Sequence, residues 1–233
     1  MIEGPKLLGE ALAAGAFIET VFVEGEGNEA LAEDAEGRGA SVVEVQPGVL
    51  ARAGDARTPQ GVAAIVGMVD VPLSDLHVDD LRLAVVCVDL QDPGNAGTVL
   101  RGAAASGAGA VIFSAGAVDV FNPKAVRASA GAVFQVPVTV APTAEEALDQ
   151  MAGWGLRRMA ADASSGRDYR DCRLSDPIAL VLGSESHGLP ASLVSHVDET
   201  VRIPMERGVE SLNVAMAACI LCFEAARQRR ASS

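Results

Sequence analysis

The segment 83–90 constrains the fold most, because every residue in it except Asp89 is apolar. A strand without polar alternation is covered on both faces, as the strands of parallel sheets are. Further apolar runs follow it along the chain, and segments with helical periodicity separate them. Strands that alternate with helices predict a parallel sheet between helical layers. We therefore expect an α/β domain over residues 81–230.

The elements of this domain are predicted from apolar periodicity and from helix start signals. The expected strands are 83–90, 110–114, 134–140, one within 155–162, 178–182 and 201–204. The expected helices are 95–106, 122–129, 143–153 and 211–230, with Asn95, Thr143 and Ser211 as N-caps.

Residues 1–69 are predicted to form a smaller α/β unit, and the acidic, Pro72-containing segment 70–80 a linker. Its expected helices are 5–14, 29–36 and 47–53, and its expected strands are 18–23, 41–45 and 61–69. Residues 1–80 carry 4 basic and 15 acidic side chains, a net charge of −11, whereas residues 81–233 carry 14 and 16, a net charge of −2. The total of −13 argues against a nucleic-acid partner, but the nearly neutral second part allows a local basic patch.

The chain has neither an apolar run long enough to span a membrane nor the order of a signal peptide, so a cytoplasmic location is expected. Four cysteines fit that location. Cys219 and Cys222 form a C-x-x-C inside an alanine-rich helical pattern, with no second cysteine or histidine pair nearby. We therefore interpret them as core residues rather than as a zinc or redox site.

Three loops follow predicted strands, where ligands of parallel α/β sheets bind. They read DLQDPGNAGTVLR from Asp89, LVLGSESHGL from Leu180, and IPMERGVESLNVAMAA from Ile203. Taken singly, each has an ordinary structural explanation as a capped helix or a glycine-bounded turn. Gly183 would let a ligand approach the backbone, whereas His187 in its turn is more often solvated than catalytic.

Together, these loops resemble the three signature motifs of the SpoU-type (TrmH-like) family, in the SPOUT class of RNA methyltransferases. The matching stretches are DPGNAGTVLRGAAASGA, LVLGSESHGL and IPMERGVESLNVAMAACILCFEA, and FNPKAVRASAGAVFQVPV between them also fits. The resemblance covers residues 81–230. The first part, with KLLGEAL and TPQGVAAIV, resembles the L30e-like substrate-binding domain of many members, but it lacks their basic segment and first helix. We expect that it is truncated or that the start codon is assigned differently.

The resemblance implies a C-terminal deep trefoil knot that binds S-adenosylmethionine, without a metal. It also implies a homodimer that pairs through the knot region and the last helix, with an active site drawn from both copies. The implied reaction transfers a methyl group to a ribose 2′-hydroxyl of RNA, with ribosomal RNA favoured over transfer RNA. The cofactor-binding residues that it implies are Gly183, Ile203, Met205, Ser211, Leu212 and Asn213.

The implied catalytic residues are Asn95, Arg101, Glu185, Ser211 and Asn213. The family proposal makes Arg101 the base, but a guanidinium stays protonated at neutral pH and a phosphate would favour the cation. We prefer the hypothesis that Arg101 positions an RNA phosphate and stabilises the developing alkoxide. Glu185 is expected to fix the knot through backbone N–H groups.

Basic residues of the second part are expected to contact RNA, first among them Arg101, Lys124 and Arg127. Arg157, Arg158, Arg227, Arg229 and Arg230 could add to them, although the last three equally suit a solvated helix end. The acidic first part motivates one alternative, a knotted methyltransferase with a small-molecule acceptor. A second alternative is a cofactor-binding RNA module without catalysis, against which Asn95, Arg101 and Ser211 argue.

Overall fold

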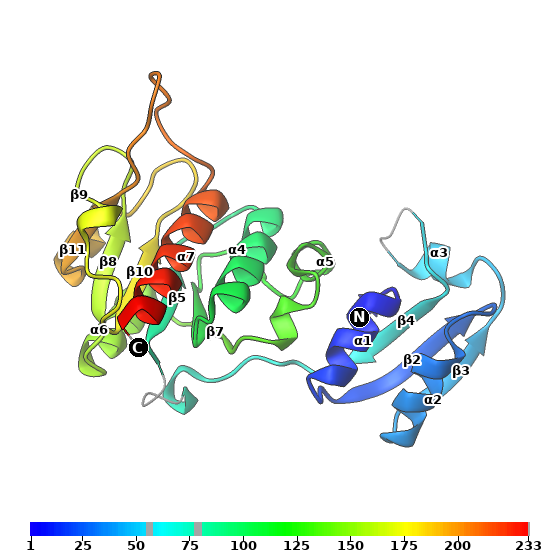
Figure 1. Ribbon diagram of the computed structural model, residues 1–233. Helices are drawn as coiled ribbons and strands as arrows, with labels where there is room; N and C mark the ends of the chain where they lie inside the picture. Colours follow the sequence, from blue (N-terminus) through cyan, green and yellow to red (C-terminus); the bar gives the residue numbers. More distant parts are fainter. Residues whose placement is uncertain (55–57, 77–80, 233) are drawn as a thin grey trace.

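The computed structural model describes residues 1–54, 58–76 and 81–232. Its two units follow each other along the chain and lie next to each other, joined by one extended segment (Figure 1). The N-terminal unit contains a four-stranded sheet in the order β1-β4-β2-β3. Its strands are β1 (Ile2–Glu3), β2 (Ile18–Glu24), β3 (Ser41–Val45) and β4 (Val62–Val66), and its helices are α1 (Pro5–Ala13), α2 (Glu29–Gly37) and α3 (Val49–Ala53).

The C-terminal unit contains a seven-stranded sheet in the order β7-β6-β5-β10-β8-β11-β9, and every described pairing in it is parallel. The strands are β5 (Leu83–Cys87), β6 (Ala110–Ser114), β7 (Val138–Ala141), β8 (Arg157–Ala161), β9 (Arg167–Asp168), β10 (Ile178–Leu182) and β11 (Glu199–Arg202). Because β10 lies between β5 and β8, the carboxyl ends of β5, β10, β8 and β11 are neighbours. The predicted parallel α/β fold is confirmed.

Helices cover both faces of this sheet. The longer helices are α4 (Pro93–Ser106), α5 (Pro123–Ser129), α6 (Ala144–Gly153) and α7 (Val214–Ser232), and the 3-10 turns are η1 (Leu73–Asp75), η2 (Ala132–Phe134), η3 (Tyr169–Asp171) and η4 (Ala191–His196). None of the described helices is long and apolar enough to cross a lipid bilayer.

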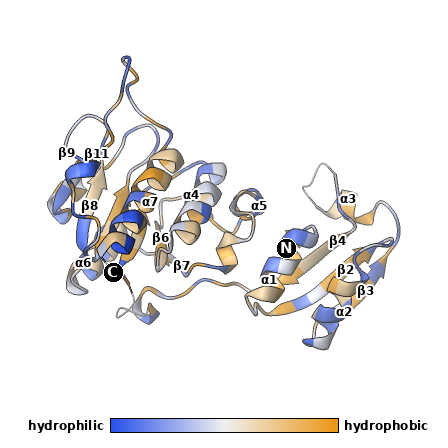
Figure 2. Cartoon of the chain, in the orientation of Figure 1, coloured by the Kyte–Doolittle hydropathy of each residue, from blue (hydrophilic) through white to orange (hydrophobic). Residues whose placement is uncertain are grey.

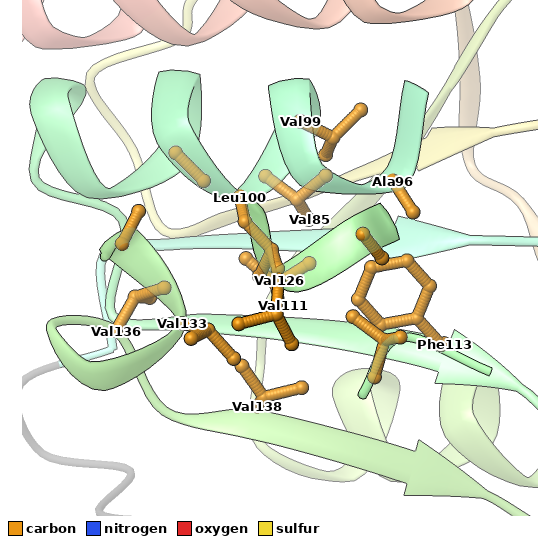
Figure 3. Close-up of a cluster of buried hydrophobic side chains, with 14 of the residues drawn as sticks. Val85, Ala96, Val99, Leu100, Val111, Phe113, Val126, Val133, Val136 and Val138 are labelled. Atoms are coloured by element: carbon orange, nitrogen blue, oxygen red, sulfur yellow. The ribbon is translucent and has the colours of Figure 1, made fainter. Parts of the chain in front are cut away.

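Alternate residues of each central strand point into two separate cores. Val85, Val111 and Val138 pack with α4, α5 and α7, as Figure 3 shows for α4 and α5. Ala84 and Ile112 pack with α6 and η4 on the opposite face. The central strands are therefore apolar throughout, and Figure 2 shows them as orange strands between the helices. The apolar run at residues 83–90 follows from burial of this strand on both faces.

Two glycines let helices approach α4 closely. A Cβ atom at Gly97 would lie 2.4 Å from the carbonyl oxygen of Ala125 on α5, and one at Gly102 would lie 2.5 Å from Sγ of Cys219 on α7. Cys222, one turn further along α7, is buried. The interpretation of the C-x-x-C as part of a packed helix is therefore consistent with its position, and burial raises the pKa of the Cys222 thiol to about 12.

Three helix starts test the predicted caps. Thr143 caps α6, as expected, because its Oγ1 accepts from the N–H of Glu146 at 3.0 Å. The predicted cap Asn95 is wrong, since the carboxylate of Asp92 accepts from the N–H of Asn95 and Pro93 occupies the first turn, where it suits a helix. The predicted cap Ser211 is also wrong, because α7 begins only after Asn213.

The predicted strand over residues 134–140 is wrong in its first half. Phe134 ends the turn η2, and the strand β7 starts at Val138. Pro137, which lacks an N–H group, contributes only its carbonyl oxygen, which accepts from Val111 at 2.9 Å. The apolar pattern therefore predicted a strand that begins too early in the sequence.

Polar contacts between described residues join the two units. Arg127 of α5 lies 3.4 Å from the carboxylate of Glu3, and Gln135 donates to Glu10 at 2.7 Å. The expected linker is partly ordered, because the N–H of Val71 donates to the carbonyl of Val138 at 2.8 Å. Residues 77–80 of that segment lie outside the described residues.

Candidate active site

A cavity of about 390 Å³ lies at the carboxyl ends of β10, β8 and β11 and the start of α7. The loop from β11 to α7 extends away from the rest of the unit (Figure 1) and supplies one wall. The lining residues are Ala161, Asp162, Ala163, Leu182, Gly183, Ser184, Glu185, Gly188, Val201, Ile203, Met205, Ser211, Leu212, Asn213, Val214, Ala217 and Leu221. The cavity thus combines an apolar interior with polar groups contributed by loops.

A chain of hydrogen bonds joins the three loops that the sequence singles out. Oε1 of Glu185 accepts from Nδ2 of Asn95 at 2.9 Å and from the N–H of Asp92 at 3.2 Å, and Oε2 accepts from the N–H of Gln91 at 3.2 Å. Nδ2 of Asn213 donates to Oδ1 of Asn95 at 2.9 Å. The loops after β5, β10 and β11 are therefore held together by side chains. Glu185 does bind backbone N–H groups, and these belong to the loop after β5.

The ionised form of Glu185 is favoured in this position. Burial is the largest influence on its pKa and raises it, but the hydrogen bonds from Asn95 and from backbone N–H groups together lower it below the ordinary value. Glu185 is thus a structural anion whose oxygen atoms are already occupied.

Asn213 has a second role at the start of α7. Its Oδ1 accepts from the N–H of Ala215 at 3.0 Å and from that of Met216 at 3.3 Å, so that it caps the helix. Ser211 and Leu212 precede the helix in an irregular segment and line the cavity. One amide group therefore fixes both the direction of α7 and its link to Asn95.

A glycine is required at position 183 because the turn that follows approaches its backbone closely. Ser184 and Gly188 exchange two backbone hydrogen bonds of 3.0 Å, and a Cβ atom at Gly183 would lie 2.1 Å from the carbonyl carbon of Gly188. The sequence suggested that this glycine admits a ligand, and it does line the cavity. The close approach inside the protein is the stronger reason for a glycine.

The predicted cofactor residues gather in one place: Gly183, Ile203, Met205, Ser211, Leu212 and Asn213 all line the cavity. Arg101 does not. It is exposed on α4, and no carboxylate of the described residues pairs with it.

Lys124 and Arg127, which are expected with Arg101 to contact RNA first, already have acidic partners. Lys124 lies 3.6 Å from Asp92, and Arg127 pairs with Glu3. His187 is exposed at the tip of its turn, where Nδ1 lies 2.7 Å from the hydroxyl oxygen of Ser186.

The sequence analysis missed the loop after β8. Ala161, Asp162 and Ala163 line the cavity between the ends of β10 and β11. The signal that could have indicated them is that the strand predicted within 155–162 is followed by a polar loop, as are the strands before the three loops with motifs. Without the strand order, nothing indicated that its end lies among theirs.

The residues present suit a nucleoside ligand with a charged extension. The apolar side chains of Ile203, Leu212 and Leu221 can enclose a base, and the loops offer polar atoms at the rim. Within the described ranges, no three His, Cys, Asp or Glu side chains are grouped so that they could hold a metal ion.

A cavity at the carboxyl ends of adjacent parallel strands defines a ligand-binding α/β protein, here with a smaller N-terminal unit. The SpoU rRNA Methylase family matches residues 82–223, and the MRM3-like substrate binding domain matches residues 1–64. The chain belongs to the SpoU rRNA methylase family.

Characterised relatives match nearly the whole chain. It is 31% identical over 96% of its length to the 23S rRNA (guanosine(2553)-2′-O)-methyltransferase RlmP of Bacillus subtilis, and covers 86% of that protein. The AdoMet-bound rRNA methyltransferase of Sinorhizobium meliloti is 33% identical with a TM-score of 0.87, over 97% of this chain and 85% of that one. The AdoMet complex of the SpoU methyltransferase AviRb of Streptomyces viridochromogenes is 28% identical with a TM-score of 0.88, over 99% and 90%.

Proposed function

We propose that the protein transfers a methyl group from S-adenosylmethionine to a ribose 2′-hydroxyl of ribosomal RNA. The observation that carries this function is the cavity whose lining contains all six residues implied to bind the cofactor. Relatives named for this reaction on 23S rRNA support the substrate class, as does the AdoMet bound in two structural neighbours. A small-molecule acceptor is not favoured.

S-adenosylmethionine, when bound, supplies a methyl group activated by a sulfonium. The apolar residues Ile203, Leu212 and Met205 hold the nucleoside part, and Gly183 contributes the backbone of the loop after β10. Asn95, Asn213 and Ser211 orient the attacking hydroxyl group. Glu185 acts through them, because its carboxylate fixes Asn95 and the backbone that precedes α4. Most of the acceleration then comes from positioning.

Arg101 binds an RNA phosphate and stabilises the alkoxide that develops on the ribose oxygen. Its exposure and the absence of an acidic partner among the described residues leave the guanidinium available for this role. Arg101→Lys removes the planar fork but keeps the charge. Loss of methylation is expected, and near-normal methylation would exclude both a bidentate role and a base role for Arg101.

The proposal extends to the assembly. A homodimer in which Arg101 reaches the cavity of the partner copy fits its position outside the cavity of its own chain. Met216 and Phe223 of α7 are about half exposed, at 55% and 49%, and would supply apolar contact in such a dimer. Sedimentation or light scattering tests this, and a monomer that methylates RNA would exclude it.

We also propose the finer features implied by the family. They are a deep trefoil knot in which the C-terminal segment threads through a loop, an L30e-like fold for residues 1–69, a linker over 70–80, a methyltransferase domain over 81–230, and a cytoplasmic location. Lys124 and Arg127 would contact RNA after exchange of their acidic partners for phosphates.

The function is tested by incubating the protein with labelled S-adenosylmethionine and, separately, ribosomal RNA, transfer RNA and a small-molecule extract. Label is expected on a 2′-oxygen of ribosomal RNA. Label in the extract alone, or in no RNA, would overturn the proposal. Label on a base would overturn the roles of Asn95 and Arg101.

A further inference from the structure

The loop after β8 brings one carboxylate into the cavity that no sequence motif indicated. Asp162 follows the last residue of β8, and its N–H donates to the carbonyl of Val201 at 3.0 Å. This bond holds it between β10 and β11, and its side chain lines the cavity. The position is therefore determined by the sheet and not by a mobile surface segment.

The side chain of Asp162 is fixed by its own turn. Oδ1 accepts from the N–H of Ser164 at 2.6 Å, from its hydroxyl group at 2.7 Å and from the N–H of Ser165 at 2.9 Å. Burial is the largest influence on the pKa and raises it, but the hydrogen bonds from Ser164 and Ser165 bring it below the ordinary value, so Asp162 is ionised at neutral pH. The three bonds of known length all converge on Oδ1, and the hydroxyl group of Ser165 adds a further hydrogen bond to the carboxylate.

Asp162 and Glu185 are the two acidic residues of the lining, and no basic residue lines the cavity. They differ in the state of their oxygen atoms. Both oxygens of Glu185 are engaged by Asn95 and by backbone N–H groups, whereas the three measured donors to Asp162 all reach Oδ1. Of the two acidic residues of the lining, Asp162 is therefore the one whose carboxylate is available to a ligand.

We propose that Asp162 binds the α-ammonium group of S-adenosylmethionine. This inference rests on the proposed function. A compact ammonium group can form an ion pair with a single anionic oxygen, whereas a ribose diol held bidentately needs both oxygens, and Oδ1 already has three donors. The loop after β8 therefore recognises the amino-acid end of the cofactor, and the apolar wall opposite recognises the nucleoside.

The test compares two ligands on two proteins by titration calorimetry without RNA. The ligands are S-adenosylhomocysteine and its analogue in which hydrogen replaces the α-amino group. The proteins are the wild type and Asp162→Asn, which keeps an acceptor for the N–H groups of the turn but loses the charge. The wild type is expected to bind S-adenosylhomocysteine about five- to tenfold more tightly than the analogue, as for a partly exposed charge-assisted contact, and Asp162→Asn to bind both ligands about equally.

The control is Asp168→Asn, since Asp168, the last residue of β9, also accepts from a backbone N–H in a turn but does not line the cavity. It should behave as the wild type. Equal weakening of both ligands by Asp162→Asn, or the same preference in both proteins, would overturn the assignment. Should Asp162→Asn not fold, equal binding of both ligands to the wild type would still overturn it. If the wild type binds neither ligand, the proposed function fails instead.

Discussion

The side-chain amide of Asn95 joins Glu185 to Asn213, with one hydrogen bond of 2.9 Å on each side. The three residues come from three loops that are far apart in the sequence. The middle residue can satisfy both neighbours because an amide has a donor and an acceptor. Asn95 therefore links the site by donating to Glu185 through Nδ2 and accepting from Asn213 through Oδ1.

Asn95→Ala should remove both hydrogen bonds at once. The loops after β5, β10 and β11 would lose their common link, and we expect kcat/KM for methylation to fall about 100-fold, as for a displaced catalytic geometry. The measurement is methyl transfer to ribosomal RNA under subsaturating conditions. Thr98→Ala, on the same helix, removes only a bond from its hydroxyl group to the carbonyl of Gly94 and serves as the control. Equal activity of the two variants would contradict the role of Asn95.

Binding of S-adenosylhomocysteine should weaken in acid because of Glu185. Its pKa is lowered from the ordinary value in the folded protein, so the carboxylate that holds Asn95 and the loop after β5 is ionised at neutral pH and is lost only as the pH falls through that lowered value. Calorimetry from pH 6 to about pH 3.5 measures this. In Glu185→Gln the decline below pH 4.5 should be smaller, with weaker binding at neutral pH. An unchanged pH profile would show that another group is responsible.

Gly183→Ala should destabilise the protein and abolish cofactor binding. The added Cβ would lie 2.1 Å from the carbonyl carbon of Gly188, so that the turn must open. We expect a loss of about 1–3 kcal/mol in the free energy of unfolding, as for other overpacked positions. Gly153→Ala is the control, because nothing lies within 4 Å of its added Cβ. Denaturant titration of both variants makes the comparison, and equal stability would be inconsistent with the close approach.

Iodoacetamide at pH 8 should label Cys219 before the other cysteines. Cys87, Cys172 and Cys222 are buried, whereas Cys219 is partly exposed. Burial also raises the pKa of all four thiols, most of all that of Cys87, so labelling is expected to be slow until denaturant is added. Mass spectrometry of peptides gives the order. Rapid labelling of Cys222 in the native protein would mean that α7 is not packed as described.

Lys124→Ala should weaken RNA binding without affecting the fold. Its exposed pair with Asp92 contributes at most about 1 kcal/mol, whereas loss of one phosphate contact lowers the slope of log K against log salt concentration by about 1. Arg173→Ala, which breaks another exposed 3.6 Å ion pair, is the matched control. RNA titrations at several salt concentrations test the difference. Identical slopes for both variants would remove Lys124 from the interface.

The sequence predicted most of what local patterns determine. Apolar runs gave β3, β6 and β10 with their observed ends. The start of α7 was misplaced because Ser211 and Asn213 are both good caps, and only the tertiary bond to Asn95 favours the second. The short strands β1 and β9 were missed, since each has two residues and is defined by its neighbour.

Site residues that lie in sequence motifs were predicted, whereas a residue whose place in the site depends on the order of strands in the sheet was missed. Gly183 and Leu212 were found from their loops. Asp162 was not, because its relevance depends on β8 lying between β10 and β11, which no local pattern encodes. The acidic partners of Lys124 and Arg127 were likewise invisible, since Glu3 lies more than a hundred residues away from Arg127 in the sequence.

The bonds between Val71 and β7 limit how the two units can reorient. Before Val71 in the sequence, Gly67 is fixed to the N-terminal unit, because its N–H donates to the carbonyl of Phe17. Two residues, Met68 and Val69, lie between these fixed points, because Asp70 already forms a bridge to Val138, and Val69 packs against an apolar cluster that contains residues of both units. The length of the segment after Val71 therefore does not extend the reach of the N-terminal unit, which cannot move away from the larger unit while these bonds persist.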